Sequence, residues 1–580
     1  MSKSLFRTKK IASILAEGSD DAHGGGGLKR VLSMRDLTFF GIAAILGAGS
    51  FSSLGGAVFH GGPGVVILFI ITAIACAFTA LCYSEFASRI PVAGSAYTYA
   101  YASFGELFAW VIGWALIMEY SIGNIYVAYS WSDYFTSFLE KINVHIPQYL
   151  CTSYMEVKDA LADESTNKDV LDAWNKAPMI GSLRIIFDLP AFVINILITL
   201  LVYRGIRESR NFSNVMVVLK MIVVSLVILV GGWLVFSNGL TFNWTPANDE
   251  GVKAFMPNGF NGVMAAVSGV FFAYIGFDAV SVLAEESKNP QRDLPRGMIL
   301  SLVICTIVYI LLTLVLTGAV NYRKFEGVGD PLAFIFEKQN LDVGWMQFFV
   351  AIAAVVAMTS VLLVFQMGQP RIWMSMSRDG LMPPVFQKIH KKYKTPSFAT
   401  IVTGLVVGVP ILFTDKTFVL DFTSIATLFA FVLVCGGVLL IPQKEKQAGK
   451  FHLPYINGRV IFPIIIFGAM VLATSFSKSY FADIFSFDFS GNADYTKGKI
   501  SFMDAATPNI SLIIFWAFAV ALSIIAFIKK YSLIPLMGLI TCMYLLTGMT
   551  KSNWAWFLGW LAIGVVIYLL YGYRKSKLAS

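Results

Sequence analysis

Charged residues are scarce in this chain: Asp, Glu, Lys and Arg make up 14% of its 580 residues, whereas about a quarter of an ordinary soluble protein is charged. The scarcity excludes a soluble globular class, because 57% of the residues are hydrophobic and apolar runs of about 20 residues recur along the whole chain. The sequence therefore predicts an all-α polytopic membrane protein, embedded in the lipid bilayer.

Motifs for catalysis and metal binding are also missing. None of the five histidines shares a predicted span with a second ligand, and neither a Walker loop nor an HExxH motif is present. The six cysteines have no framework spacing. We expect no enzyme activity, no cofactor, no metal site and no transport driven by ATP through this chain alone. No apolar signal-peptide segment precedes residue 37, so we expect no cleavable signal peptide.

The apolar runs predict about fourteen membrane segments, and basic residues give their orientation. The net charge of +9 fits the positive-inside rule better than nucleic-acid binding. With the N-terminus inside, 29 of the 44 Lys and Arg lie on the inner side and 14 on the outer side. Both termini are then cytoplasmic. The segments lie near residues 37–59, 64–87, 103–135, 189–203, 212–236, 260–284, 298–320, 345–370, 397–414, 421–441, 459–477, 509–528, 532–549 and 554–573.

Two of these segments are interrupted near their middle by glycine and small polar residues: 39–59 and 262–283. A helix broken inside hydrocarbon leaves backbone groups unpaired, which is tolerated where the backbone lines a cavity or a ligand site. The first enters the membrane from inside and the sixth from outside, which predicts a LeuT-type 5+5 inverted repeat with a midplane site. The predicted regions are an N-terminal cytoplasmic segment (1–36), a first repeat (37–236) with a long outer loop (136–188), a second repeat (260–441), four additional helices (459–573) and a C-terminal cytoplasmic segment (574–580).

The two breaks offer complementary chemistry. At Gly47–Phe51 the helix restarts, so free N–H groups and a positive dipole end favour an anion such as a carboxylate. At Phe272–Asp278 freed carbonyl oxygens would accept hydrogen bonds from an ammonium group. Together they suit an α-amino acid. The alternatives are a small-residue packing face at the first break and an aromatic-packed kink at the second.

Lys220 and Glu119 are ionisable residues inside predicted spans. A lysine there costs roughly 2.5–3.5 kcal/mol on insertion scales. One interpretation is a side chain that snorkels to the inner surface. The other is a lysine that faces the bundle interior, where burial favours its neutral form and lets it bind and release a proton during transport. Glu119 is a second candidate for proton coupling.

A charged run follows the sixth segment at residues 284–297. Its Asn-Pro and Leu-Pro pairs mark turns. Glu285, Glu286 and Arg292 could form a cytoplasmic gate or hinge, and the alternative is an ordinary charged loop.

Three motifs carry a family resemblance: GAGSF (47–51), FFAYIGFDAVSVLAEESKNPQRDLPRG (271–297) and QPRIWMSMSRDGLMPP (369–384). They resemble the APC (amino acid–polyamine–organocation) superfamily, and most of all its cationic amino acid transporter branch. The resemblance covers most of 30–440, whereas 441–580 matches mainly by hydropathy.

The resemblance implies the LeuT-type fold and residue roles. Lys220 would be linked with proton coupling, and Glu119 matches a carboxylate of this branch. Phe277 would close the pocket. The substrate carboxylate and amino group would meet the two breaks, at Ile45, Gly47, Ala48, Gly49 and Ser50 and at carbonyls of Phe272, Ala273 and Ile275.

Ser50 departs from the family pattern, which usually has an apolar residue there. The change could alter the side-chain end of the pocket or only the local helix. We find no clear acidic group to pair with a cationic side chain, which favours small neutral or broad substrates.

The sequence thus predicts a secondary active transporter of amino acids in the cytoplasmic membrane, operating by proton-coupled symport. The alternatives are an exchanger or a polyamine or amine transporter on the same fold, or a nutrient sensor that does not transport. Its expected partners are a small-molecule substrate, protons and the lipid bilayer, with no nucleic acid and no obligate protein partner evident.

Overall fold

The structure is a computed structural model of the chain. It describes residues 5–14, 28, 30–47, 49–162, 168–181, 183–247, 251–414, 416–441, 451–476, 478–487 and 501–578.

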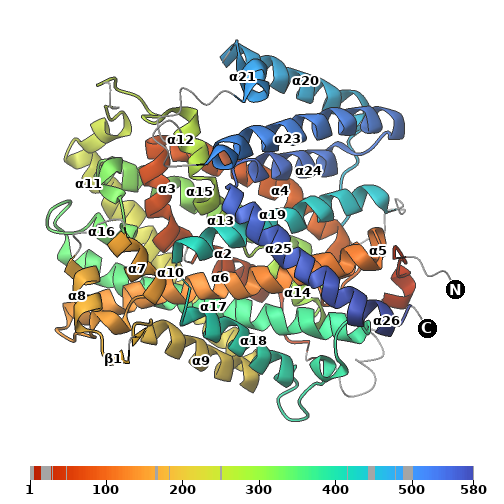
Figure 1. The fold of residues 1–580 in the computed structure, drawn as a ribbon, viewed down its shortest axis with the longest axis horizontal. Coiled ribbons are helices and arrows are strands. Elements are labelled where there is room, and N and C mark those ends of the chain that lie inside the picture. The colour runs from red at the N-terminus through yellow and green to blue at the C-terminus, as the bar shows by residue number, and fades with distance from the viewer. Residues whose placement is uncertain are drawn as a thin grey trace.

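Helices form most of the described structure (Figure 1). The strands β1 (Met179–Ile180) and β2 (Leu183–Arg184) form one short antiparallel hairpin. The helices are α2 (Met34–Ile45), α3 (Leu54–Gly61), α4 (Val65–Arg89), α5 (Ala96–Ser103), α6 (Glu106–Lys141), α7 (Tyr154–Ala162), α8 (Lys168–Lys176), α9 (Leu189–Arg204), α10 (Ile206–Leu226), α11 (Gly232–Ser237), α12 (Gly259–Ala265), α13 (Val267–Tyr274), α14 (Ala279–Val282), α15 (Pro290–Ala319), α16 (Pro331–Phe334), α17 (Gly344–Arg378), α18 (Ser397–Ile411), α19 (Lys416–Leu440), α20 (Gly458–Phe476), α21 (Tyr480–Ser486), α23 (Phe502–Lys529), α24 (Leu533–Leu546), α25 (Lys551–Ile567) and α26 (Tyr573–Lys575).

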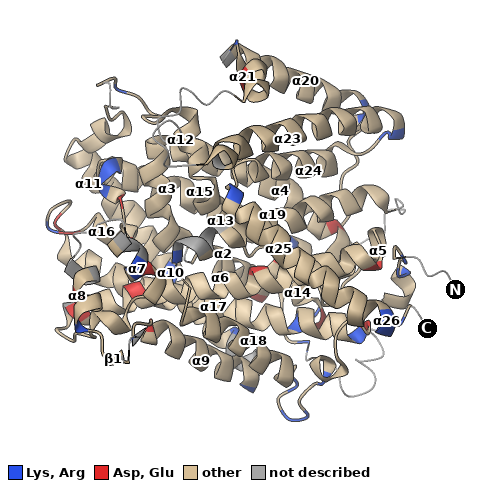
Figure 2. Cartoon of the chain, viewed as in Figure 1, with Lys and Arg blue, Asp and Glu red and all other residues tan. Residues whose placement is uncertain are grey.

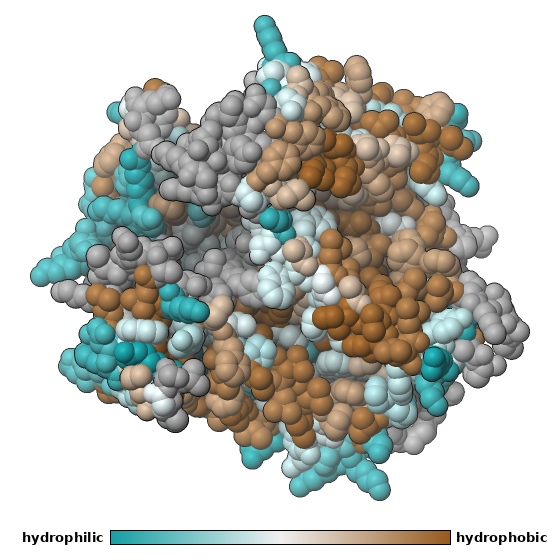
Figure 3. Space-filling view, in the orientation of Figure 1, coloured by the Kyte–Doolittle hydropathy of each residue, from teal (hydrophilic) through white to brown (hydrophobic). Residues whose placement is uncertain are grey.

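The bundle has two distinct ends. In Figure 1 both termini lie at the right, beside α26, and α7, α8 and β1 lie at the left. We call these ends the termini face and the cap face. Charged residues gather mainly toward the ends of the helices and in the loops, with few between (Figure 2). Hydrophobic residues cover much of the surface over α23 and α25 (Figure 3). This distribution is that of a membrane-embedded bundle.

The apolar segments expected from the sequence are helical, but not all are long. Within the described residues, nine helical runs have the length and composition to cross a membrane, or ten if the bent pair α12 and α13–α14 counts as one span. That pair bends by 46°. Three further apolar helices, α9, α18 and α24, are shorter. The polytopic helical class is thus supported, while the count of fourteen spans stays a prediction.

Two long helices form the centre of the bundle. α6 has 36 residues and α17 has 35, and they pack against each other along much of their length. α10 and α18 pack on α17, while α19 packs on α6. α15 packs on α2 and α4, so that the interrupted N-terminal segment is held between α15, α10 and α17. This packing places the first break in the interior.

The C-terminal helices lie at the periphery. α24 packs on α4 and α19, and α25 packs on α19 and α6. In α20, α23 and α25 only 17–22% of the apolar window is buried, compared with 89% in α6. Their exposed apolar faces are suited to lipid.

The loop between α6 and α9 folds over the cap face. It carries α7, α8 and the hairpin, and it has a small core of its own made of Val157, Ala173, Ala177 and Ile186. Part of the predicted outer loop is therefore an ordered cap.

Candidate functional site

The first break separates α2 from α3. The last helical residue of α2 is Ile45, and Leu46 departs from helical geometry with ψ 82°. A π-helical turn, Gly49–Ser53, then leads into α3. Ala48, expected in this site, lies outside the described residues. The sequence prediction of an unwound segment at this position therefore agrees with the described backbone.

The second break lies between α13 and α14. Ile275 is extended, and Gly276 has φ +120°, a conformation that residues with a side chain rarely adopt. A Cβ added to Gly276 would lie 2.5 Å from the Cβ of Ala44. Glycine is required here by both the backbone angle and the close approach of α2.

The two breaks meet in the interior. A Cβ added to Gly49 would lie 2.4 Å from the Cα of Ala273. The Tyr309 hydroxyl on α15 lies 2.6 Å from the carbonyl oxygen of Ile45 and 2.7 Å from that of Ala273. A hydroxyl has one proton to donate, so it can satisfy only one of these carbonyls at a time. The sequence did not single out Tyr309, because nothing in an apolar span marks a tyrosine as a bridge.

Ser50 is engaged within the first break. The N–H groups of Ser50 and Phe51 both donate to Gly47 O at 3.0 Å, and the Ser50 hydroxyl donates to the same oxygen at 3.0 Å. Ser50 is fully buried. These contacts favour a local role for this departure from the family pattern. Two N–H groups of the first break are therefore paired within the break.

Lys220 is completely buried and does not reach the surface. Its Nζ donates to Ala43 O at 3.0 Å, to Leu46 O at 2.6 Å and to the Ser360 hydroxyl at 3.2 Å. Two of these partners are carbonyls at the C-terminal end of α2, where the helix dipole is negative. The ammonium group thus holds the backbone directly before the first break.

Glu119 lies apart from Lys220. No described hydrogen bond or ion pair joins them. Glu119 instead lies close enough to Asp278, inside the second break, for their charges to interact. Both side chains are at most 3% exposed, and the second oxygen of each, Oε2 and Oδ2, has no hydrogen-bond partner within the described structure. Asp278 thus places an acidic group in the second break itself, which bears on the expectation of no clear acidic group to pair with a cationic side chain.

The aromatic residues expected in the site are all buried. Phe272 contacts Tyr126 edge to face, with ring centroids 4.6 Å apart. Phe277 packs on Phe431 at 5.1 Å and on Tyr83 at 6.1 Å. Ile275 is 2% exposed. Phe272 thus faces α6, whereas Phe277 packs between α4 and α19.

A vestibule of about 800 Å³ opens from the cap face toward the first break. Ser52 and Ser53 of the π-helical turn are among its lining residues. Lys416 Nζ pairs with Asp133 Oδ2 at 2.5 Å across it and lies 5.6 Å from the Tyr126 ring. Its other lining residues are Gly56, Ala57, His60, Tyr129, Cys151, Glu156, Asp188, Ala265, Ala266, Ser268, Gly269, Gly327, Val328 and Gly329.

The charged run forms ion pairs with the C-terminal part of α17. Glu286 accepts from Arg371 through both carboxylate oxygens, at 2.8 and 2.5 Å, and both side chains are at most 2% exposed. Glu285 accepts from Arg378 at 2.8 Å and from the backbone N–H of Ala93 at 3.1 Å.

Arg292, the third expected gate residue, is not brought to this contact. Its side chain is 56% exposed and lies 3.4 Å from neighbouring Asp293 on α15. The sequence did not identify Arg371 and Arg378 as the partners, because they lie 85 and 93 residues further along the chain.

A family model described as amino acid permease matches residues 32–485, which include both breaks, Lys220 and the charged run. The chain belongs to the amino acid permease family. The resemblance to the APC superfamily inferred from the three motifs is confirmed. Amino acid transport is the activity of this family, and the permease is a multi-pass membrane protein.

Similar curated proteins carry different substrate names. The permease is 40% identical over 465 residues to the branched-chain amino acid permease BcaP of Bacillus subtilis (strain 168), covering 80% of this chain and 91% of that protein. It is 37% identical over 467 residues to the methylthioribose transporter of the same strain, with the same coverage. It is 30% identical over 635 aligned residues to the vacuolar cationic amino acid transporter 2 of Arabidopsis thaliana, covering 100% of this chain and 94% of that protein.

Proposed function

We propose that this permease is a proton-coupled symporter of amino acids in the cytoplasmic membrane, which works by alternating access on a LeuT-type 5+5 repeat with both termini inside. The single observation that carries the proposal is Lys220, whose ammonium group is bound to carbonyls at the end of α2 beside the place where the two breaks meet. Proton exchange at Lys220 then acts directly on the backbone that binds substrate.

The coupling follows from what the ammonium group does to α2. When Lys220 is charged, it neutralises the exposed carbonyl end of α2 and holds it to α10 and to Ser360 of α17. When it loses a proton, it loses its charge and part of its hydrogen-bonding capacity, so this attachment weakens. Because Leu46 directly precedes the break, the protonation of Lys220 biases the conformation of the substrate site.

The amino group of the substrate has a ready acceptor. Tyr309 can donate to Ile45 O or to Ala273 O, and Ile45 O also accepts from the N–H of Gly47 at 2.9 Å. When the hydroxyl donates to Ile45 O, Ala273 O is left to accept from an ammonium group. The carboxylate would bind the N–H groups of the first break, after the contacts between Ser50 or Phe51 and Gly47 O open. Ile45, Gly47, Ala48, Gly49 and Ser50 remain the proposed carboxylate side, and Phe272, Ala273 and Ile275 the ammonium side, with Phe277 beside them.

Alternating access requires one gate on each face of the bundle. In this state the vestibule is open on the cap face, and the Glu286–Arg371 and Glu285–Arg378 pairs close the other face. Inward opening requires these pairs to separate. Arg292 contributes no contact to the closed gate.

Glu119 and Asp278 bear on a second candidate substrate class. Two buried carboxylates without a described cation partner are costly, and a cationic side chain would compensate them. The relatives named for branched-chain and for cationic amino acids make both classes candidates here. Glu119 also remains a proposed proton-binding group. With a neutral substrate, which brings no cation, a bound proton would neutralise its carboxylate.

Uptake by proteoliposomes tests the proposal. An inward proton gradient should accelerate uptake of at least one member of a panel of small neutral, branched-chain and cationic amino acids. Lys220→Ala should abolish the dependence on the gradient, whereas Lys253→Ala, on an exposed loop, should not. If the unmodified protein takes up every substrate in the panel at a rate that does not depend on the gradient, proton coupling is overturned. A requirement for internal substrate would identify an exchanger, and binding without flux would identify a sensor.

A further inference from the structure

Both chain ends are fixed to the termini face. We call residues 5–14 the strap and residues 568–578 the tail. The strap lies against the start of α6, where helix N–H groups have no partner within the helix. Glu106 N donates to Arg7 O at 2.9 Å, and Leu107 N donates to Leu5 O at 3.1 Å. The strap therefore caps α6 through its backbone, much as a side-chain cap would.

One buried carboxylate holds the strap and the tail together. Glu106 is fully buried. It accepts from Arg7 at 3.0 Å on the strap, and from Tyr568 at 2.8 Å and Ser576 at 2.5 Å on the tail. The Tyr101 hydroxyl donates to it as well, at 3.0 Å. Because strap and tail donate to the same carboxylate, loss of the tail would leave Glu106 buried with fewer donors.

A second carboxylate ties the same two segments to α17. Asp379 pairs with Lys9 at 2.5 Å and accepts from the Tyr97 hydroxyl at 2.6 Å. Its backbone oxygen accepts from Lys577 N at 3.0 Å. Asp379 directly follows Arg378, the partner of Glu285. Movement of Arg378 away from Glu285 therefore strains the contacts of both strap and tail.

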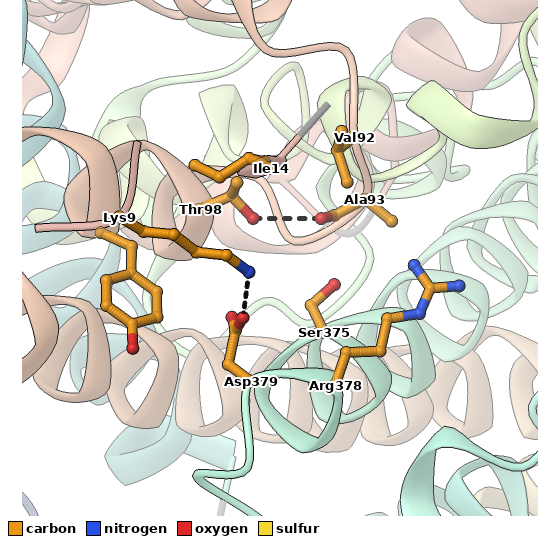
Figure 4. A pocket seen from close by; sticks show the side chains of 9 residues that line it. Lys9, Ile14, Val92, Ala93, Thr98, Ser375, Arg378 and Asp379 are labelled. Carbon is orange, nitrogen blue, oxygen red and sulfur yellow. Dashed lines mark hydrogen bonds and ion pairs between the residues drawn. The ribbon is translucent and has the colours of Figure 1, made fainter. Parts of the chain in front are cut away.

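Lys9 of the strap is drawn in Figure 4 with the side chains around it. A cavity of about 20 Å³, large enough for about one water molecule, lies under it between Thr98, Ser375 and Arg378. The Lys9 side chain points across this cavity to Asp379. Lys9 is only 8% exposed. The strap thus completes the seal that the ion pairs of the charged run begin.

The tail is held in place by α25. Trp110 and Trp114 of α6 donate from their indole N–H groups to Gly564 O at 2.8 Å and Trp560 O at 2.9 Å. The Trp114 and Trp560 rings stack at 4.7 Å. The family match covers 32–485, so both strap and tail lie outside it, whereas their anchors Glu106 and Asp379 lie within it.

We propose that the strap and the tail form a latch across the inner exit, and that the tail sets how readily the strap leaves it. The inference rests on the proposed alternating access, in which this exit must open. It gives the last helices a function: α25 positions the tail, and the tail stabilises the outward-facing state. Weakening either segment shifts the population toward the inward-facing state.

Thiol labelling of Ser375→Cys tests the latch. Ser375 lines the cavity under Lys9 and is 5% exposed. A membrane-impermeant maleimide is applied from the termini side to the full-length protein in vesicles. Lys9→Ala and Ser576→Asp, which places a carboxylate against Glu106, should each raise the labelling rate about tenfold, the change produced by roughly 1.4 kcal/mol. The double variant should show less than the product of the two effects, since both open one latch.

Matched controls lie beside each change. Lys10 directly follows Lys9, Arg574 lies two residues before Ser576, and both side chains are exposed. Lys10→Ala and Arg574→Ala should leave the labelling rate unchanged. Lys9→Arg keeps the charge and should stay near the unmodified rate. Gel filtration and a thermal melt exclude misfolded variants. Latch variants that label at the rate of their controls would overturn the proposal. Labelling needs no substrate or proton gradient, so this outcome is distinct from a failure of proton-coupled uptake.

Discussion

Gly49 and Ala273 lie in direct contact, so that the two interrupted segments touch through backbone atoms with no side chain between them. A Cβ on Gly49 would lie 2.4 Å from the Cα of Ala273 and 2.8 Å from its Cβ. Contacts this short involve backbone, which cannot move aside cheaply. The relative position of the two breaks is therefore fixed by the absence of one side chain.

Gly49→Ala should separate the breaks. Overpacking of this kind costs roughly 1–3 kcal/mol, and uptake should fall at least about tenfold because both halves of the substrate site shift. Initial uptake rates in proteoliposomes measure the effect. Gly468→Ala, in the peripheral α20, is the control because nothing lies within 4 Å of its added Cβ. Equal uptake by the two variants would contradict the proposed role of the contact.

Tyr309→Phe removes the hydroxyl shared by Ile45 O and Ala273 O. Substrate binding should weaken about tenfold, since the ordering of the two carbonyls is lost and one buried acceptor goes unpaired, at roughly 1–3 kcal/mol. Substrate-induced thermal shifts report the change in affinity. Tyr455→Phe, at an exposed position before α20, should leave them unchanged. Unchanged substrate affinity in Tyr309→Phe would mean that the hydroxyl does not contribute to substrate binding.

Glu286→Gln should destabilise the protein strongly. Removing one charge of a buried pair leaves Arg371 uncompensated, at about 3–5 kcal/mol. Asp172→Asn provides the comparison, because its 2.7 Å pair with Lys176 is 51–68% exposed and is worth about 0–1 kcal/mol. Thermal unfolding in detergent should show a large drop for the first variant and almost none for the second. Similar melting temperatures would argue against a structural gate at Glu286.

Asp188, which precedes α9 on the cap face, should make stability depend on pH. Burial raises the pKa of its carboxyl from 3.8 to about 7, despite hydrogen bonds from Ser132 and Ala191. Between these values the folded state binds more protons than the unfolded state, so the contribution of Asp188 to stability declines as the pH rises from about 4 to 7.

Asp188→Asn should flatten that decline while keeping the helix cap, because Asn is also a good N-cap residue. The difference in melting temperature between variant and unmodified protein should grow in favour of the variant as pH rises. Asp172→Asn, at an exposed site, should follow the unmodified curve. A constant difference across this pH range would show that Asp188 does not carry the effect.

Local signals in the sequence predicted the backbone features well. Glycine within an apolar run predicted both breaks, and the distance of Lys220 from either end of its span predicted a costly buried charge. The long lysine stem also allowed a side chain that snorkels to the inner surface. In the structure the ammonium group instead donates to three buried acceptors.

Partners distant in sequence could not be predicted. Tyr309, Arg371 and Arg378 have no local pattern that marks them, and their roles depend on how helices pack. Asp278 lies within the 271–297 motif, but its proximity to Glu119 depends on the unwinding of the second break. The proposed latch is built from residues near both chain ends, which the three family motifs do not include, so the motifs could not indicate it.

Cys151 gives the native chain a site for thiol labelling on the cap face. The other five cysteines are buried, and Cys151 lines the vestibule on the cap face. Burial and nearby acidic residues raise the pKa of its thiol to about 12, so its reaction at neutral pH should be slow and should quicken in alkaline buffer. Without any substitution, a reagent added from that side therefore reports the vestibule. Combined with a single cysteine at position 375, it would let both entrances be followed in one molecule during transport.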